Sequence, residues 1–423
     1  MTLQTYLDRV ASCIKDFKDN RKGSNKSYTM KELGMAAYSV FHMQSPSFLA
    51  HQQNMNRRKG KHNGETLFGF SKIPSDNHIR QCLDHVDPET LSPFFDAIPH
   101  DINMEEWSID GRLLIAIDGV TFFSSSKIHC QCCLEKEHSN GAISYSHAAL
   151  CPVIVHPSQK QVLPLMPMFI KNEDGQEKQD CEINAAKRWV ANNKEFLTKH
   201  KVIFLGDDLF SREPFIELLC AIPEVDYVFV AKPSSHTYMY QWIADLDGVE
   251  KTTHEVKDKA FASDYHLYTI ANDVPLNGKE HCSKVSYLDM VVKNKRGKQK
   301  YHNSFVTSLK LTPQNIHKIA CMGRNRWRIE NEAFNVLKTK GYHLAHNFGH
   351  GSKNLANVLA ILNIVAFTVH TLWQMKNETF HKMFNAFSSR KQFFQNLVSL
   401  TLFHLFDSWE HFLDFVKDGL EES

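Results

Sequence analysis

The 423-residue sequence lacks any large excess of charge of one sign. Its 49 lysines and arginines nearly balance its 47 aspartates and glutamates, which gives a formal net charge of +2 at pH 7. A chain this close to neutrality does not attract nucleic acid through uniform basic charge. Any basic surface that binds a polyanion must therefore be local, such as a focused groove.

The sequence also lacks an evenly spaced cysteine framework, although it contains ten cysteines. Its first thirteen residues, MTLQTYLDRVASC, do not have the pattern of a signal peptide. We therefore expect reduced thiols and a cytoplasmic location. Internal repeats and long low-complexity segments are absent as well.

Long hydrophobic runs are also scarce. Residues 355–373, LANVLAILNIVAFTVHTLW, come near the length of a membrane span but contain Asn357, Asn363 and His370. Polar side chains of this kind are costly in lipid. The run favours a buried helix of a soluble protein over a membrane helix, and we expect no membrane partner.

The composition is that of an ordinary globular protein, with 42% apolar and 23% charged residues, and the length predicts two or three domains. The N-terminal part has a helical, polar pattern with a basic loop at 54–66, and Ser75 is placed to cap a short helix. Residues 112–123 and 201–210 are short aliphatic runs typical of strands buried on both faces. An amphipathic helix at 181–200 separates them, and this alternation predicts the α/β class.

Strand patterns then multiply between about 225 and 320. The segment KNKRGKQK, residues 293–300, is typical of a basic hairpin tip. Helical patterning resumes at residue 313 and continues to the end.

Acidic residues stand at the ends of the two predicted core strands. Asp118 is followed by Gly119, and Asp207 and Asp208 follow Gly206. A buried carboxylate without a partner is costly, and a divalent cation offsets that cost. Two such ions can activate water and stabilise the leaving oxygen of a phosphodiester, which is chemistry that needs a third converging acid.

The third acid is found in the segment GRNRWRIENEAFNVLKTKGYHLAHNFGHG, residues 323–351. Arg326 and Glu330 are four residues apart and share a helical face. The acid would hold metal while neighbouring bases hold the phosphates of a substrate. A surface helix of ion pairs is the alternative explanation, and the two strand-end aspartates favour the metal site.

A second group of metal-ligand residues lies in 127–151. Cys130 and Cys133 have knuckle spacing, and His138 and His147 follow, which together predict a hairpin that holds a structural Zn²⁺. His129 and Cys132 are alternative ligands. Reduced cysteines beside surface histidines explain the segment equally well.

Three motifs carry a resemblance to a known family. Asp118-Gly119, LGDDLFS and RWRIENEAFNVLK, in this order, resemble the DDE transposases of bacterial insertion sequences, in the branch whose glutamate lies in an Arg-Trp-x-Ile-Glu helix. The resemblance covers roughly residues 110–375. It implies a catalytic triad of Asp118, Asp207 and Glu330 that binds Mg²⁺ or Mn²⁺, with Asp208 and Glu332 as rivals for the last two positions.

The resemblance also implies residues that contact DNA. Arg326 matches a phosphate-contacting arginine of the family, and Lys338 stands one residue beyond the position where a lysine is expected. Gly323 stands where the family usually has a tyrosine. Arg328 is a further candidate for phosphate binding on the same helix.

Aromatic residues in the β-rich region are candidates for stacking with unpaired bases of the transferred strand. These residues are Trp242, Tyr238 and Tyr240. Packing in the protein interior is the alternative for each.

The implied fold is an α/β ribonuclease-H-like catalytic core with a β-rich insertion, flanked by helical N- and C-terminal regions. The regions are a helical DNA-binding region (1–105), the first part of the catalytic core with the zinc hairpin (106–224), the β-rich insertion (225–312), the glutamate helix of the core (313–352) and a C-terminal helical region (353–423).

The implied activity is metal-dependent cleavage and strand transfer of DNA at insertion-sequence ends. The implied partners are transposon ends, target DNA and a second copy of the chain, in the bacterial nucleoid. A metal-dependent nuclease that cuts without joining and an inactive DNA-binding descendant are the alternative functions.

Overall fold

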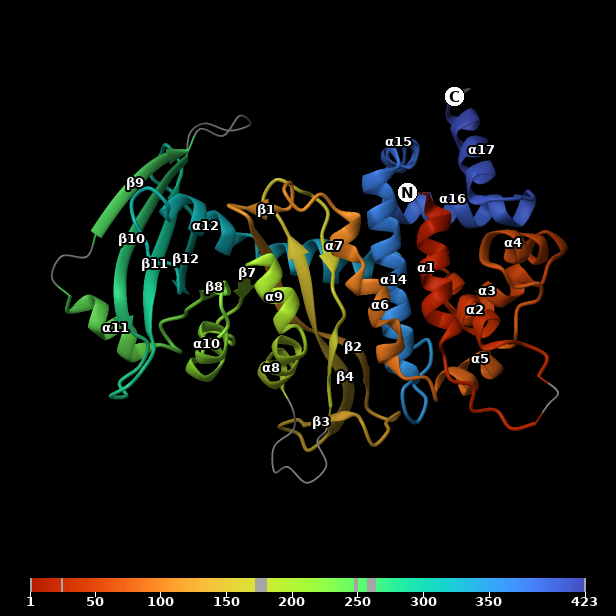
Figure 1. Ribbon diagram of the computed structural model, residues 1–423, viewed down its shortest axis with the longest axis horizontal. Coiled ribbons are helices and arrows are strands. Elements are labelled where there is room, and N and C mark those ends of the chain that lie inside the picture. Colours follow the sequence, from red (N-terminus) through yellow and green to blue (C-terminus); the bar gives the residue numbers. More distant parts are fainter. Residues whose placement is uncertain (1, 24–25, 172–180, 247–249, 257–263, 422–423) are drawn as a thin grey trace.

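The computed structural model describes residues 2–23, 26–171, 181–246, 250–256 and 264–421. It has a mixed α/β architecture in which one large sheet lies beside a block of helices (Figure 1). The α/β class predicted from the sequence is therefore confirmed.

The sheet is mixed and contains twelve strands, in the order β3-β4-β2-β7-β8-β12-β11-β10-β9, with β1 paired to β2 and both β5 and β6 paired to β4. β2 is antiparallel to β4, whereas β2, β7 and β8 run parallel to one another. The strands are β1 (Ser108–Ile109), β2 (Arg112–Ser125), β3 (Leu134–Glu137), β4 (Ile143–Val155), β5 (Leu163–Pro164), β6 (Met168–Ile170), β7 (Val202–Gly206), β8 (Asp226–Val230), β9 (Glu250–Val256), β10 (Asp264–Pro275), β11 (Lys284–Lys293) and β12 (Gln299–Thr307).

The helices associated with the sheet follow its strands in the chain. They are α8 (Glu182–Asn192), α9 (Lys194–His200), α10 (Glu213–Cys220), α11 (Thr237–Ala244), α12 (Ile316–Arg324), the π-helical η2 (Ile329–Phe334) and α13 (Asn335–Thr339). The single helix predicted at 181–200 is divided at Asn193, whose side chain donates to the carbonyl of Trp189 over 2.7 Å.

Strands β9 to β12 extend the core sheet instead of forming a separate body. β12 pairs with β8, so the antiparallel extension continues directly from the parallel strands (Figure 1). The hairpin tip between β11 and β12 is confirmed: Asn294 accepts from the amides of Arg296 and Lys298 over 3.0 Å, and Gly297 has a φ of +76°. A positive φ suits glycine, which has no Cβ to clash.

The helical block contains both ends of the chain (Figure 1). Its members are α1 (Leu3–Lys15), α2 (Met30–His42), α3 (Phe48–Met55), α4 (Arg58–Phe68), α5 (Asp76–Leu83), η1 (Pro88–Leu91), α6 (Ser92–Asp96), α7 (Ile98–Asp101), α14 (Leu355–Lys376), α15 (Glu378–Ala386), α16 (Arg390–Phe403) and α17 (Trp409–Glu421). Ser75 caps α5 as predicted, because its hydroxyl accepts from the amide of His78 over 3.3 Å.

Helix α14 runs through the centre of this block. Among the described residues it is the one helix long and apolar enough to cross a membrane, and 94% of its most apolar window is buried within the protein. It packs against α2 and α1, and it also contacts β5 of the sheet. The prediction of a buried helix is confirmed.

The N- and C-terminal helical regions are joined by direct hydrogen bonds. Asn63 donates to the carbonyl of Thr401 over 2.7 Å, and the indole of Trp409 donates to the carbonyl of Leu67 over 3.0 Å. The basic loop predicted at 54–66 is wrong, because α3 continues to Met55 and α4 begins at Arg58. Gly60 allows this close turn, because a Cβ at this position would lie 2.2 Å from the carbonyl oxygen of Asn54.

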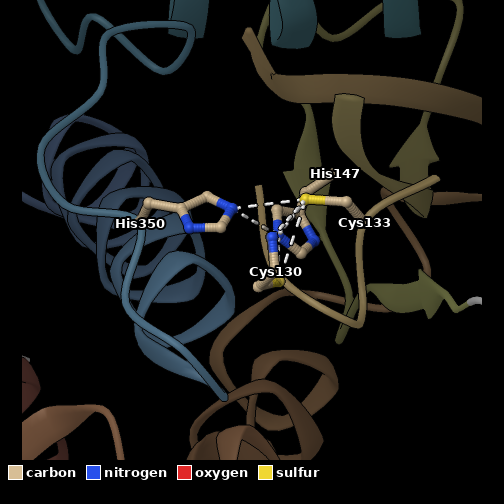
Figure 2. A group of neighbouring side chains, drawn as sticks. All are labelled: Cys130, Cys133, His147 and His350. Carbon is tan, nitrogen blue, oxygen red and sulfur yellow. Dashed lines mark hydrogen bonds between the residues drawn. The ribbon is translucent and has the colours of Figure 1, made fainter. Parts of the chain in front are cut away.

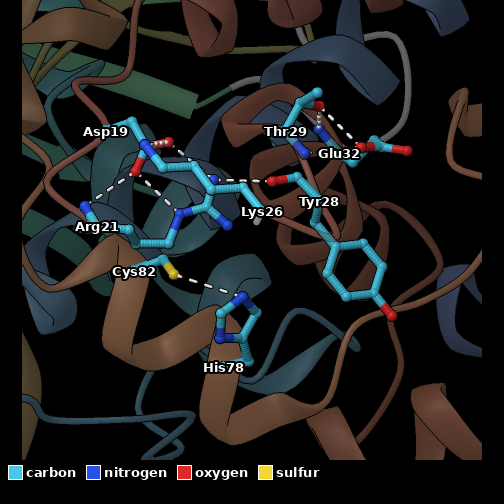
Figure 3. A network of polar contacts seen from close by, with 8 residues as sticks. All are labelled: Asp19, Arg21, Lys26, Tyr28, Thr29, Glu32, His78 and Cys82. Carbon is cyan, nitrogen blue, oxygen red and sulfur yellow. Dashed lines mark hydrogen bonds and ion pairs between the residues drawn. The ribbon is translucent and has the colours of Figure 1, made fainter. Parts of the chain in front are cut away.

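A polar network fixes the connection between α1 and α2 (Figure 3). Asp19 accepts from both Arg21 and Lys26 over 2.9 Å, and Arg21 also donates to the carbonyl of Tyr28. Thr29 and Glu32 then form a reciprocal capping box at the start of α2. These contacts hold the entry to α2, which packs on α14.

The N-terminus of α14 receives a carboxylate from the N-terminal region. Asp84, directly after α5, accepts from the backbone amides of Ser352, Lys353, Asn354 and Leu355 over 2.9–3.1 Å. Burial alone would raise the pKa of Asp84, but these hydrogen bonds outweigh it and lower the pKa below its usual value. The free amides and dipole at a helix start favour such an anion.

We expect Asp84→Ala to reduce the free energy of unfolding by about 2–4 kcal/mol at pH 7, because several buried amides lose a charged acceptor. Since the folded-state pKa is lowered, this stabilisation is present above the unfolded-state pKa and is lost as pH falls through the folded-state value. Urea unfolding at pH 7 and near pH 3 measures both effects. Asp414→Ala, at an exposed position of α17, is the matched control. Equal midpoints for the two variants at pH 7 would contradict the assignment.

Candidate active site and metal site

Asp118 lies in β2, and Asp207 directly follows the adjacent parallel strand β7. In the register of β2 and β7, Ala116 is opposite Leu205, and each aspartate follows its partner residue by two positions. Neighbouring strands are about 4.8 Å apart, and residues two apart share a face. The sheet therefore brings the two carboxylates together.

The environment of Asp118 disfavours its ionised form. Burial raises the pKa of this carboxyl to about 7; a hydrogen bond from the Gly119 amide opposes the shift, the charge of Asp207 adds to it, and the guanidinium of Arg326 opposes it. A carboxyl with such a pKa gains strongly from a cation beside it.

Arg326 connects the strand acid to the helix acid. Its Nη1 lies 3.8 Å from an oxygen of Asp118 and donates to Glu330 over 2.6 Å. Arg326 and Glu330 share a face as expected, but they form the ion pair of the alternative explanation, and Arg326 reaches Asp118 as well. Arg326 supplies the positive charge between the two acids in this structure.

The segment around Glu330 differs from the regular helix that the sequence predicts. Helix α12 ends at Arg324, Asn325 and Arg326 form a turn, and Ile329–Phe334 is π-helical. The buried Ile329 anchors the segment, which packs against β2 and β4. Wider π turns often occur at functional sites, because they change the direction of a side chain within a helix.

The structure distinguishes Asp207 from its neighbour Asp208. Asp208 is buried and accepts from the amide of Lys232 over 2.5 Å and from the hydroxyl of Ser235. Asp207 is half-buried, accepts only locally from the Leu209 amide over 2.9 Å among its described hydrogen bonds, and interacts with Asp118. Asp208 is thus engaged in holding the loop after β8, whereas Asp207 faces the other acid.

Glu330 and Glu332 differ in the same way. Glu330 is exposed and bonded to Arg326, whereas Glu332 is half-buried and interacts electrostatically with Arg328. Arg328 in turn donates to the carbonyl of Pro157 over 2.9 Å, away from the aspartates. Glu330 is the acid that reaches the aspartate pair through Arg326.

A fourth acid belongs to this cluster, and the sequence analysis did not assign it. Burial and the charge of Asp207 raise the pKa of Glu182, which stands at the start of α8 and also interacts with Asp118. A Cβ on Gly119 would lie 1.9 Å from Oε1 of Glu182. The Asp-Gly pair therefore has a steric reason, since the glycine makes room for a carboxylate beside Asp118.

The acids do not form a closed metal cage. Within the described part of the chain, the cysteine-histidine cluster is the only group of three or more ligand residues whose ligand atoms lie within 4.8 Å of one another. Arg326 links Asp118 to Glu330, and the charge of Asp207 acts on Asp118, but the three carboxylates do not all lie within 4.8 Å of one another.

The other residues predicted to contact DNA have mixed surroundings. Lys338 is exposed, Trp242 is half-buried against the core, and the Tyr240 hydroxyl donates to the carbonyl of Ala231 over 2.8 Å. Tyr238 is exposed. Trp327, next to Arg326 in the chain, is 42% exposed, and the guanidinium of Arg328 lies 5.3 Å from the centroid of its ring.

The cysteine-histidine cluster consists of Cys130, Cys133, His147 and His350 (Figure 2). The predicted ligand His138 is not in this group, and its Nε2 instead lies 2.9 Å from the hydroxyl of Ser144 at the protein surface. His350 takes its place from a loop 203 residues after His147. This cluster could bind a metal ion such as zinc.

The two alternative ligands also lie outside the group. His129 stacks on Tyr145 with ring centroids 4.4 Å apart, and Cys132 is exposed. Cys130, Cys133 and His147 could be recognised from their spacing in the sequence, whereas His350 could not.

We expect Asp118→Asn to stabilise the protein by on the order of 1–2 kcal/mol at pH 8 in buffer without added divalent cations. Asp118 has a raised folded-state pKa, so its ionisation removes stability as pH rises from the unfolded-state value through about 7. Asparagine has no such penalty, and the two proteins should have similar stability near pH 4. Thermal unfolding of both across this range tests the sign, with Asp245→Asn, at an exposed position, as the control. A pH-independent difference would contradict it.

We expect Asp208→Ala to reduce the free energy of unfolding by about 1–3 kcal/mol, because the amide of Lys232 loses its buried acceptor. Asp207→Ala should change it by less than about 1 kcal/mol, since removing this charge also relieves repulsion at Asp118. Urea unfolding of both variants at pH 7 makes the comparison. A larger loss for Asp207→Ala would reverse the assignment of the two aspartates.

Comparison with known proteins adds no evidence for or against these assignments. No protein-family model and no curated protein matches the sequence. The roles of Asp118, Glu330 and the cysteine-histidine cluster are therefore argued from their positions and chemistry.

Proposed function

We propose that this protein is a DDE-type DNA transposase. In this proposal β4, β2, β7 and β8 form a ribonuclease-H-like core, and β9–β12 form the β-rich insertion between the second aspartate and the glutamate. The observation that carries the proposal is the meeting of three distant acids: Asp118 and Asp207 at equal register, with Arg326 joining Asp118 to Glu330.

The acids fit a hard divalent cation. Carboxylate oxygens are the preferred ligands of Mg²⁺ and Mn²⁺. Burial, together with the charge of Asp207, raises the pKa of Asp118, so a cation beside this carboxyl would favour its ionised form. Asp118, Asp207 and Glu330 would hold the metal, with Glu182 beside them. Bound Mg²⁺ at such a site supplies a more acidic water and stabilises the leaving oxygen of a phosphodiester.

The proposed reaction has two steps, each at a different phosphorus atom. Water first attacks a phosphodiester at the transposon end; its oxygen bonds to phosphorus as the bond to the 3′-oxygen breaks, and this oxygen takes up a proton. The freed 3′-hydroxyl then attacks a target phosphodiester, loses its proton, and displaces the target's own 3′-oxygen. Neither step needs an external energy source. The first step is a hydrolysis, and the second exchanges one phosphodiester for another.

Arg326 is placed to grip phosphate during these steps. A guanidinium binds phosphate through a planar fork of donors, and this one already lies between two of the acids. Arg328 is less suited, since it donates to Pro157 and Asn325 within the protein. Exposed Lys338 and Trp327 flank the same segment and would contact the backbone and bases of the substrate.

The remaining parts of the proposal concern partners. The helical region 1–105 would recognise transposon ends, and the basic hairpin tip 293–300 would contact phosphates. Two copies of the chain would bring two ends together in the bacterial cytoplasm, at the nucleoid.

Purified full-length protein is incubated with linear DNA that carries the sequences flanking its coding region, a supercoiled target plasmid, and Mg²⁺ or Mn²⁺. We expect cleaved ends and joined products, which disappear in EDTA. Asp118→Asn, Asp207→Asn and Glu330→Gln should each reduce product formation by at least about 100-fold, because several kcal/mol of metal stabilisation corresponds to such a factor. DNA binding, measured by gel shift, should remain.

Glu332→Gln is the matched control and should keep most activity, since this acid interacts with Arg328 instead of the aspartates. Cleavage without joining would favour a metal-dependent nuclease. Full activity of all three triad variants would refute the site, and DNA binding without any cleavage by the unchanged protein would indicate an inactive descendant.

A further inference from the structure

The spacing of the cysteine-histidine cluster matches a tetrahedral zinc site. Ligands of a tetrahedron are separated by about 1.6 times the metal–ligand distance, so zinc predicts about 3.8 Å between sulfurs, 3.5 Å between sulfur and nitrogen, and 3.3 Å between nitrogens. The structure has 3.8 Å between Cys130 and Cys133 Sγ, and 3.5 Å from each sulfur to His147 Nε2. His350 Nε2 lies 3.3 Å from Cys133 Sγ and 3.2 Å from His147 Nε2.

The surrounding hydrogen bonds present the correct atoms. His350 Nδ1 lies 2.8 Å from the carbonyl of Gly351 and donates to it, which leaves Nε2 with a free lone pair. Such a donation to a second partner is the usual way to orient a metal-binding imidazole. In the knuckle, the amide of Cys133 donates to the carbonyl of Cys130 over 3.2 Å, and the amide of Cys130 points to Cys133 Sγ over 3.4 Å.

The cluster is enclosed. Cys133, His147 and His350 are buried, and aromatic rings from β2 cover the two histidines. Phe122 stacks on His147 with centroids 6.0 Å apart, and Phe123 lies 4.4 Å from His350. Four protein ligands without an open position are typical of a structural zinc site and not of a catalytic one.

A disulfide does not explain the cysteine pair. The sulfurs of Cys130 and Cys133 are 3.8 Å apart, whereas a disulfide needs about 2.05 Å, and neither cysteine forms a disulfide. Two thiolates and two neutral imidazoles also form a donor set that binds Zn²⁺ in preference to Mg²⁺.

The cluster joins parts of the chain that are far apart. Three ligands belong to the β2–β4 hairpin and its knuckle, and the fourth belongs to the loop between α13 and α14 (Figure 2). The same loop is bonded on its other side to Asp84. A bond across 203 residues would restrict the unfolded chain strongly, because loop-closure entropy grows with loop length.

We propose that Cys130, Cys133, His147 and His350 bind one structural Zn²⁺ that crosslinks the β2–β4 hairpin to the loop before α14. The site contributes to the stability of the fold independently of any reaction at the acids. Its test therefore does not depend on DNA.

The test begins with metal analysis of full-length protein purified without chelators. We expect about one zinc per chain, and cobalt exchange should give the absorption of tetrahedral Co²⁺ together with thiolate-to-cobalt charge transfer. Cys133→Ser and His350→Ala should lower the zinc content at least about tenfold and lower the melting temperature. His350→Cys keeps a zinc-competent donor and should retain metal, which separates ligand loss from misfolding.

Cys132→Ser and His138→Ala are the matched controls and should keep full zinc content, because these side chains lie outside the cluster. Protein that contains no zinc and takes none up on refolding with Zn²⁺ would overturn the site. Zinc loss in either control, with retention in His350→Ala, would overturn the ligand assignment. Zinc content that is unchanged while DNA joining is absent would leave this site intact and refute only the proposed function.

Discussion

Two carboxylates at the same level of adjacent parallel strands repel each other, and partial burial prevents water from screening the repulsion. The pairing of β2 with β7 fixes Asp118 and Asp207 in this arrangement, and Glu182 adds a third negative charge through the space left by Gly119. Burial and the charge of Asp207 raise the pKa of Asp118 and of Glu182, so ionisation of these two carboxyls lowers the stability of the fold. Arg326 supplies a positive charge beside Asp118, and a bound cation would offset the repulsion further.

The position of Glu330 depends on a departure from regular helix. Arg326 and Glu330 keep their i,i+4 contact, but the turn at Asn325 separates them from α12 and the wider η2 interrupts the regular helix. The buried side of η2 packs on β2 and β4, so that the polar side remains at the edge with Asp118. Downstream, the loop before α14 is tied to Asp84, which fixes the segment at its other end.

Local patterns in the sequence were sufficient for the strands, the Ser75 cap, the hairpin tip and the buried helix, because each depends on nearby residues. They failed at 54–66, where lysine and arginine suggested a loop but Gly60 and Gly64 permit close helix packing. They also failed for His350 and Glu182, since no spacing rule connects residues that meet only when the sheet and the helical block assemble. The choice of His138 was wrong for the same reason. Three members of the cluster are close together in the sequence and a fourth was expected nearby, whereas the fourth, His350, comes from a distant loop.

The cysteine-histidine cluster and the acids of the candidate active site are linked through shared elements. Asp118 and Phe123 belong to the same strand β2, and Phe123 covers His350. His350 in turn lies on the loop that follows η2, the segment that carries Glu330. A zinc ion at the cysteine-histidine cluster would therefore fix two of the elements that bring an acid to the candidate active site, β2 and η2, while contributing no ligand to it. Loss of the zinc would act on the acids through the relative position of β2 and η2, and Mg²⁺ could not replace it, because thiolate and imidazole donors suit zinc and carboxylates suit Mg²⁺.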